Sequence, residues 1–131
     1  MTHAVNETAK LSLLLDIASK AVDFVERQQT RRFAQNALNS AYYEWREAND
    51  VHQRIETDSA EWKLMMEATT SEYEDVSEAK REETNAAKRL RTSVYKYKAI
   101  VDGEKAALAG IDPVEHDTRG EIAEMFAQTH P

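Results

Sequence analysis

The first 102 residues contain no glycine and no proline, and the whole chain contains no cysteine. All three glycines and both prolines follow Asp102. Because glycine and proline form turns and interrupt helices, their absence over this length predicts long helices. The absence of cysteine excludes disulfide bonds, thiolate catalysis and cysteine-based zinc or iron–sulfur sites.

Long hydrophobic runs and targeting signals are also missing. The sequence has no stretch of about 18 uncharged apolar residues, which argues against a transmembrane helix. Its start lacks the basic, apolar and small-residue regions of a signal peptide. We therefore expect a protein that is cytoplasmic when made and is not secreted through a signal peptide.

Motifs that carry chemistry are absent as well. The sequence has no nucleophile elbow, phosphate-binding loop, dinucleotide fingerprint or His-Glu-x-x-His pattern. No glutamate stands three residues before a histidine, as a di-iron helical bundle would need. We interpret Glu115-His116-Asp117 as a solvated loop, and His52 as a polar residue paired with Glu56. We expect no enzymatic activity, no cofactor and no metal site.

The composition is lean in apolar residues for a compact globule. Of 131 residues, 41% are hydrophobic and 31% are charged, and the mean hydropathy is −0.70. These values are typical of helices that have narrow apolar seams. We therefore expect an elongated chain or subunits that complete their cores in a homo-oligomer.

Apolar residues repeat every 3.5 residues between Ala34 and Leu108. Alternate steps of four and three reach 22 positions, and sixteen of these are apolar, whereas the 41% composition alone would supply about nine. This spacing indicates a coiled coil. We expect the following seam residues to carry folding and self-association: Leu38, Trp45, Ile55, Trp62, Met66, Leu90, Val94, Tyr97 and Val101.

A broader aliphatic stripe precedes this seam and indicates an amphipathic helix. It consists of Leu11, Leu14, Leu15, Ala18, Ala21, Val22 and Val25. We expect the stripe to pack against the other apolar-rich stretch, residues 90–108, in the core of a hairpin. Only this helix could contact a membrane, and its polar face has few cations to attract anionic lipids.

The predicted fold is all-α: a long antiparallel helical hairpin, or coiled coil, with a short C-terminal helix. We expect helices at about 6–56 and 60–109, joined by a turn at 57–59 where Asp58 or Ser59 can cap the second helix. The hairpin would form one domain, residues 1–110. The alternatives are a turn near Ser71, or one unbroken helix over 34–108 that would run ~110 Å.

Charge favours the turn at 57–59. This turn sets the basic residues of 84–98 against Asp16, Asp23 and Glu26, and the acids of 61–83 against a segment that contains Arg31 and Arg32. It also places Val22 near Val94. A turn near Ser71 would instead bring acids together, which repel one another.

The C-terminal segment, residues 111–131, is predicted to form a connector and a short helix. Thr118-Arg119-Gly120-Glu121 resembles a helix start, and an apolar face follows it at spacings of three and four. That face consists of Ile122, Met125 and Phe126. It could dock a partner protein or fold back on the hairpin.

One basic stretch interleaves cations with tyrosines, a pattern that can track phosphates and stack bases. Its candidate nucleic-acid contacts are Lys88, Arg89, Arg91, Tyr95, Lys96 and Lys98. Because the chain carries a net charge of −7, we favour a structural interpretation in which these cations pair with acidic helix faces.

The order of features resembles a known family. An aliphatic start is followed by Arg/Gln/Ala-rich helix at 26–37 (ERQQTRRFAQNA), and a glycine-containing helix end follows at 99–110 (AIVDGEKAALAG). This layout resembles the small all-helical internal core, or ejection, proteins of short-tailed phages. The resemblance implies a virion component that stacks with other core proteins near the portal and leaves with the genome.

These observations predict a structural or adaptor subunit of a large protein assembly, and the resemblance makes that assembly a phage particle, in its internal core or near its portal and tail. One alternative is a small acidic effector that inhibits a host protein by mimicking nucleic acid with the acids of 56–83. A second is a nucleic-acid-associated protein that uses 88–98.

Overall fold

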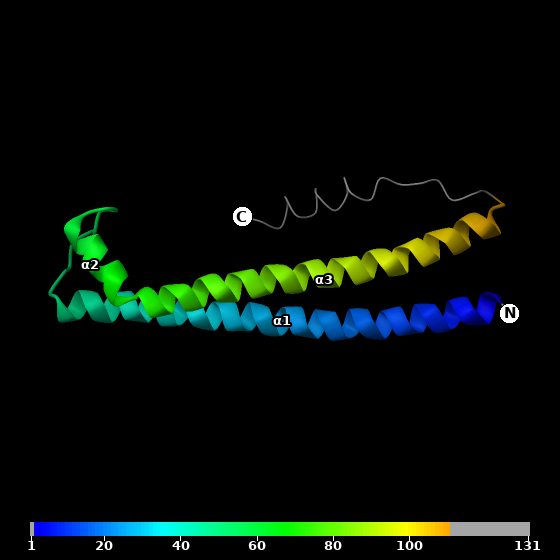
Figure 1. Ribbon diagram of the computed structural model, residues 1–131, viewed down its shortest axis with the longest axis horizontal. Coiled ribbons are helices and arrows are strands. Elements are labelled where there is room, and N and C mark those ends of the chain that lie inside the picture. Colours follow the sequence, from blue (N-terminus) through cyan, green and yellow to red (C-terminus); the bar gives the residue numbers. More distant parts are fainter. Residues whose placement is uncertain (1, 111–131) are drawn as a thin grey trace. The chain divides into compact units, whose positions relative to one another are not determined.

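The computed structural model describes residues 2–110, and every regular element in that range is a helix (Figure 1). The helices are α1 (Thr2–Ala48), α2 (Ala60–Ala68) and α3 (Thr70–Leu108). The predicted all-α fold is confirmed. The chain divides into two compact units, Met1–Tyr97 and Lys98–Pro131, and the contacts described below lie within the first.

Helices α1 and α3 lie side by side and run in opposite directions (Figure 1). Hydrogen bonds join side chains of the two helices that are far apart in sequence: Ser93 of α3 donates to Asp16 of α1, and Arg27 of α1 donates to Glu82 of α3. The predicted helical hairpin is therefore confirmed, and an unbroken helix over 34–108 is wrong.

Helix α1 ends at Ala48 in a C-terminal cap in which Asp50 occupies the left-handed position that glycine usually occupies. The backbone N–H of Val51 bonds the carbonyl of Arg46 at 2.9 Å, and that of Asp50 bonds Glu47 at 3.3 Å. These are the two bonds of a Schellman motif. Asp50 is left-handed, with φ 53°, a conformation that aspartate tolerates better than most residues.

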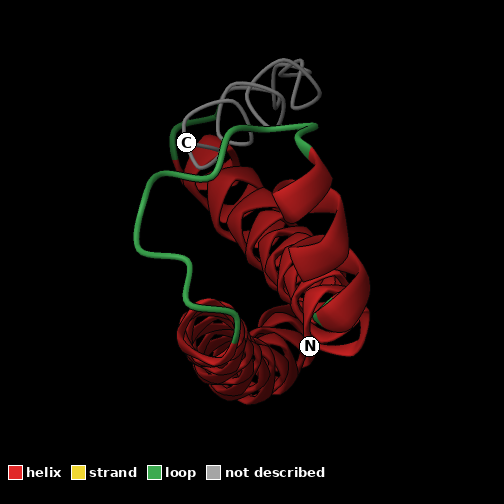
Figure 2. Cartoon of the chain, turned by 90° about the vertical axis from the view of Figure 1, so that its left-hand side faces the viewer, coloured by secondary structure: helices red, strands yellow, loops and turns green. Residues whose placement is uncertain are grey.

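The connection between α1 and α2 is longer than predicted. It runs over residues 49–59, whereas the sequence predicted helix up to 56 and a turn at 57–59. Figure 2 looks at this end of the hairpin and shows the connection as a green loop between the helices. His52 lies in the loop, where its Nε2 is 2.7 Å from Asp50 Oδ1, so the predicted pairing with Glu56 gives way to a loop contact.

Helix α2 is short and ends in a kink. Ser59 caps its start, since the Ser59 hydroxyl accepts a hydrogen bond from the Trp62 N–H at 3.2 Å, which makes Ser59 rather than Asp58 the capping residue. At its end, the buried Thr69 hydroxyl donates to the carbonyl of Met65 at 2.8 Å. Threonine hydroxyls that bond the previous turn often bend helices. The break that the sequence offered near Ser71 is thus a kink at Thr69 and not the hairpin turn.

The half-buried face of α1 keeps one phase along the helix. Its positions follow alternating steps of four and three: Leu13, Ile17, Lys20, Phe24, Arg27, Arg31, Ala34, Leu38, Ala41 and Trp45. From Ala34 onward this is the predicted seam. Before Ala34 the same phase continues, although the sequence predicted that the stripe Leu11–Val25 would take over.

The aliphatic stripe of α1 therefore lies on the outer side of the hairpin, which corrects the prediction that it forms the core. Leu11, Leu15 and Val22 are 60%, 65% and 59% exposed. A straight helix presents only one face to its neighbour, and that face is already set by Ala34–Trp45. Of the cations that this phase brings inward, Arg27 and Arg31 pair with Glu82 and Glu83 of α3, whereas Lys20 pairs with Asp16 of α1.

The seam of α3 agrees with the prediction at every second position. Val76, Leu90 and Tyr97 are buried or half-buried, as expected. At the positions between these, the buried residue lies one residue earlier than predicted. Ala79, Ala86 and Ser93 are buried, whereas the sequence indicated Lys80, Ala87 and Val94. Small side chains at these positions let two helix backbones approach closely.

The pairing of the two helices is offset from the predicted register. Val22 was expected near Val94, but its neighbour Asp23 pairs with Arg89, about one helical turn away. The offset arises because the connection contains the loop and α2 instead of a tight turn at 57–59. The expected charge pairing still holds, since Asp23 meets the basic stretch and Arg31 meets Glu83.

Candidate functional site

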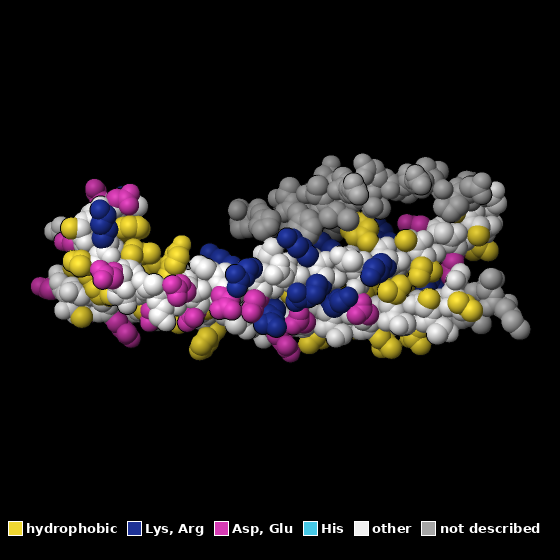
Figure 3. Space-filling view, viewed as in Figure 1, with side chains coloured by type: hydrophobic (Ala, Val, Ile, Leu, Met, Phe, Trp, Pro, Cys, Tyr) yellow, Lys and Arg dark blue, Asp and Glu magenta, His cyan; other side chains and the backbone are white. Residues whose placement is uncertain are grey.

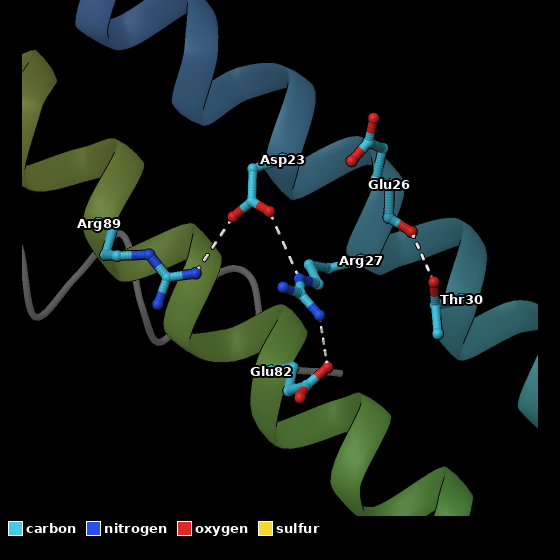
Figure 4. Close-up of polar contacts among 6 residues, drawn as sticks. All are labelled: Asp23, Glu26, Arg27, Thr30, Glu82 and Arg89. Atoms are coloured by element: carbon cyan, nitrogen blue, oxygen red, sulfur yellow. Dashed lines mark hydrogen bonds and ion pairs between the residues drawn. The ribbon is translucent and has the colours of Figure 1, made fainter.

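A ladder of ion pairs crosses the middle of the hairpin (Figure 4). Arg89 Nη2 donates to Asp23 Oδ2 at 3.1 Å, and Arg27 Nε donates to Asp23 Oδ1 at 3.4 Å. Arg27 Nη1 then donates to Glu82 Oε2 at 2.7 Å. Because Arg27 and Asp23 are both more than one-third exposed, each pair adds little stability alone. The alternating charges chiefly fix which residues of α3 face α1.

A second polar cluster lies on the side of the ion-pair ladder that is farther from the loop at 49–59, toward the open end of the hairpin. Ser93 Oγ donates to Asp16 Oδ2 at 2.6 Å, and Lys20 Nζ donates to the same oxygen at 2.9 Å and to Ser93 Oγ at 2.6 Å. The hydrogen bonds from Ser93 and Lys20, aided by the charges of Lys20 and Lys96, hold the pKa of Asp16 below its ordinary value of 3.8. The cluster ties α1 to α3 around a charged carboxylate.

This cluster has the residue types of a serine–lysine catalytic pair. Such a pair needs a serine hydroxyl that a substrate can reach. Ser93 has no exposed surface, and its hydroxyl is bonded to Asp16 and Lys20 on the neighbouring helix. The geometry fits a structural role, in which a buried hydroxyl has its hydrogen bonds satisfied across the helix interface.

The basic stretch is partly committed to the hairpin. Arg89 contacts Asp23, and Arg91 and Tyr95 are half-buried rather than displayed on the surface. Lys88 and Lys96 are exposed. Lys98, also exposed, belongs to the second compact unit. The contact of Arg89 matches the expected pairing of cations with acidic helix faces.

The structure distributes the predicted seam residues over all three helices and the loop. Leu38 is buried in α1, and Trp45 is half-buried there. The remaining seam residues are also half-buried: Ile55 in the loop, Trp62 and Met66 in α2, and Leu90, Val94, Tyr97 and Val101 in α3. Tyr42 donates to the sulfur of Met66 at 3.7 Å, and burial raises the pKa of Tyr42. This contact of Met66, and the burial of Leu38, place part of the predicted seam within the hairpin.

The predicted docking residues Ile122, Met125 and Phe126 lie outside the described residues. Before them, α3 ends at Leu108, close to the predicted end at 109. Gly110 follows with φ 69°, the left-handed conformation in which glycine commonly terminates helices.

The face of α1 turned away from α3 is uncharged over five helical turns. We call it the outer face; its members are the exposed residues between 8 and 25, namely Thr8, Leu11, Ser12, Leu14, Leu15, Ala18, Ser19, Val22 and Val25. The four charged residues of the same stretch, Lys10, Asp16, Lys20 and Asp23, are all half-buried. Figure 3 shows hydrophobic side chains along the lower edge of α1.

The exposed side of α3 differs sharply from this outer face. Over residues 74–92 it carries many charges: Glu74, Asp75, Glu78, Lys80, Arg81, Lys88 and Arg89 are all exposed. A charged helix face is stable in water, whereas a contiguous apolar face usually marks a contact with another molecule. The hairpin therefore has one solvated side and one side suited to burial.

A shallow groove of about 390 Å³ separates the two helices farther along. Its α1 wall contains Phe33 and Ala37, and its α3 wall contains Glu72, Asp75 and Glu78. Within residues 2–110 no three histidine or acidic side chains are placed to hold a metal ion. Over the same range, none of the helices has the length and apolar character needed to cross a bilayer.

No protein-family model, curated protein or solved structure matches this chain.

Sequence reasoning missed two features that the structure brings out. Ala79, Ala86 and Ser93 recur at intervals of seven, and this repeat of small residues could have identified the close-packed phase of α3. The outer face could have been found from the spacing of charge, because every charged residue between 8 and 25 falls on one side of the helix.

Proposed function

We propose that this chain is a non-catalytic structural or adaptor subunit of a larger protein assembly, and that it joins the assembly through the outer face of α1. The observation that carries the proposal is the run of nine exposed, uncharged residues on one side of a helix. In a chain with 31% charged residues, such a face is stable when another protein surface covers it.

The thin core of the hairpin supports the same proposal. Among the described residues, the buried hydrophobic side chains are Leu38, Met65, Val76, Ala79 and Ala86. Two of these five are alanines, which bury little apolar area. Long helices gain most of their stability from packing rather than from intrinsic propensity. A partner that covers the outer face would add the burial that the hairpin lacks.

The resemblance to internal core proteins of short-tailed phages adds a specific setting. We propose that the assembly is a phage particle and that the chain belongs to its internal core or to its portal and tail region. Long helical hairpins suit such a layer because they can stack side by side. No individual residue is assigned a role from this resemblance.

Particle fractionation tests the proposal. A tagged chain produced during infection should co-sediment with DNA-containing particles at a constant copy number per particle. Leu15→Glu on the outer face should remove it from the particles. Leu64→Glu is the matched control, because Leu64 is 58% exposed on α2 and Leu15 is 65% exposed. A wild-type chain that stays in the light fractions would refute the role as an assembly subunit.

The acidic surface supports a second candidate, an effector that binds a basic site on a host protein. Glu61, Glu67, Glu74, Asp75 and Glu78 are exposed, whereas Glu82 and Glu83 are used in ion pairs with α1. Binding through the exposed acids would weaken steeply with added salt. A Glu74→Lys, Glu78→Lys variant that binds a host target as tightly as the wild type would exclude this candidate.

A further inference from the structure

We propose that the outer face of α1 is covered by the α1 helix of a second copy of this chain, in antiparallel orientation, with the two helices crossing at Ala18. This inference rests on the proposed function and names the contact that begins the assembly. It moves self-association from the predicted seam, which the hairpin uses internally, to the opposite side of α1.

The pattern of side-chain sizes on the outer face points to a helix crossing. Small residues, Ala18 and Ser19, occupy its centre, with Ala21 half-buried beside them. Larger residues flank this centre: Leu14 and Val22 stand four residues away and Leu11 and Val25 seven away, while Leu15, three residues away, falls on Ala21 when the helix is reversed. Two crossing helices are closest at one point, where small side chains are needed, and larger side chains fill the widening gap.

This arrangement is self-complementary. When the helix is reversed about Ala18, Leu11 falls on Val25 and Leu14 falls on Val22. A two-fold axis through Ala18 therefore covers apolar residues with apolar residues along the whole stripe, as a symmetric dimer interface requires. The alternating steps of four and three, from Leu11 through Leu15, Ala18 and Val22 to Val25, are those of a helix-to-helix seam.

Charge favours the antiparallel orientation. Beyond the apolar stripe, the antiparallel pair brings Arg32 to within about one helical turn of Glu7 of the second copy. Both residues are exposed, and both lie on the same flank of the stripe, where antiparallel helices bring like positions together. In a parallel pair, the alternating steps that follow Val25 would instead place Gln29, Arg32 and Asn36 each against the same residue of the second copy.

Membrane contact fits the outer face less well. Helices that lie on membranes combine an apolar face with lysines and arginines that reach anionic headgroups. Here Lys10 is paired with Glu7 at 2.8 Å, and Lys20 is paired with Asp16 at 2.9 Å. The serines beside the stripe, Ser12 and Ser19, carry no charge toward a headgroup.

The interface is small. Specific protein interfaces usually bury about 800 Å² on each partner and involve 20–30 residues a side, and the outer face has nine. Association of the purified chain should therefore be weak and should depend on concentration. Within an assembly, further contacts of the same hairpins would add to it.

Sedimentation equilibrium of the purified full chain, over a concentration range of about 10 μM to 1 mM, tests the pairing. We expect a monomer–dimer equilibrium that Leu15→Glu weakens at least tenfold, since it would place two charges in an apolar contact. Leu64→Glu should leave the dissociation constant unchanged. Circular dichroism should show equal helix content for both variants, because both leucines are exposed in the hairpin.

Cysteine cross-linking tests the orientation, and the absence of native cysteine makes the result unambiguous. When Leu11→Cys and Val25→Cys chains are mixed and oxidised, the antiparallel crossing predicts disulfides between the two variants. Disulfides between two copies of the same variant would overturn the antiparallel crossing.

The remaining outcomes separate this inference from the proposed function. A wild-type chain that is monomeric at every concentration, while Leu15→Glu still removes it from particles, would overturn self-pairing and leave the assembly role. Leu15-dependent binding of the monomer to phosphatidylcholine–phosphatidylglycerol vesicles would replace the second copy with a membrane. If Leu15→Glu changes neither dimerisation nor incorporation into particles, both proposals are wrong.

Discussion

Replacing Ala86 with leucine should destabilise the hairpin, whereas the same replacement at the next residue should not. Ala86 is 1% exposed and belongs to the run of small residues that faces α1, but Ala87 is half-buried beside it. A leucine at Ala86 would add three carbon atoms at a position with almost no exposed surface. The comparison therefore tests which phase of α3 forms the interface.

The expected magnitude follows from this lack of space. Extra carbon atoms in a well-packed interior typically cost about 1–3 kcal/mol, because side chains leave their preferred rotamers and the backbone shifts. For a unit of this size, a loss of about 2 kcal/mol lowers the Tm by roughly 8–16 °C. At Ala87 the new side chain can extend along the surface, so the change should stay within about 0.5 kcal/mol.

Thermal and urea unfolding, followed by circular dichroism at a fixed low protein concentration, would measure both variants. The urea midpoint of Ala86→Leu should fall while its m-value stays constant, which would indicate lost stability rather than an altered unfolded state. If Ala87→Leu lowers the Tm as much as Ala86→Leu or more, then the phase through Lys80, Ala87 and Val94 forms the interface, and the reasoning from close approach is wrong.

Three further predictions concern polar contacts. The pKa of Asp16 is lowered in the folded chain. The ionised carboxylate of Asp16 therefore stabilises the fold above about pH 4, and this stabilisation is lost as the pH falls through the lowered pKa. When the free energy of unfolding is measured in urea between pH 2 and 6, it should fall less steeply towards acid pH for Asp16→Asn than for the wild type. In a double-mutant cycle, the charge reversals Arg31→Glu and Glu83→Arg should each destabilise the hairpin, and the double reversal should recover at least about 0.5 kcal/mol; strictly additive effects would show that the pair is not coupled. Ser59→Ala should lower the stability of α2 by about 1 kcal/mol, measured by the fluorescence of Trp62 in a Trp45→Phe background, and Ser59→Asp should not, since aspartate also caps helices well.

Much of the fold could be predicted from the absence of residues that form turns. The absence of glycine and proline up to Asp102 indicated helices, and the charge blocks indicated the hairpin. The end of α1 was harder to predict because Asp50 adopts a left-handed conformation that usually selects glycine. The dipeptide Asn49-Asp50 was the local signal for this turn, because asparagine and aspartate tolerate the left-handed conformation better than other residues that carry a side chain.

The inner face of α1 could not be found from apolar content alone. The usual assumption is that the most apolar face of a helix points to the core, and in α1 that face contains Leu11, Leu15 and Val22. In the structure a different face of α1 packs against α3, because α3 presents small side chains together with Glu82 and Glu83, which pair with cations of α1. A single sequence shows each helix separately, whereas the match between the two faces sets which side is buried.

The placement of cross-helix contacts along the hairpin has a consequence for how the chain folds. The contact between Tyr42 and Met66 joins residues 24 apart, whereas that between Asp16 and Ser93 joins residues 77 apart. Closing the longer loop first would cost about 1 kcal/mol more in chain entropy. Pairing should therefore start beside the kink at Thr69 and proceed like a zipper toward Ser93. The open end would be the last part to form during folding and the first to separate, so its amide protons should exchange with solvent before those near Leu38.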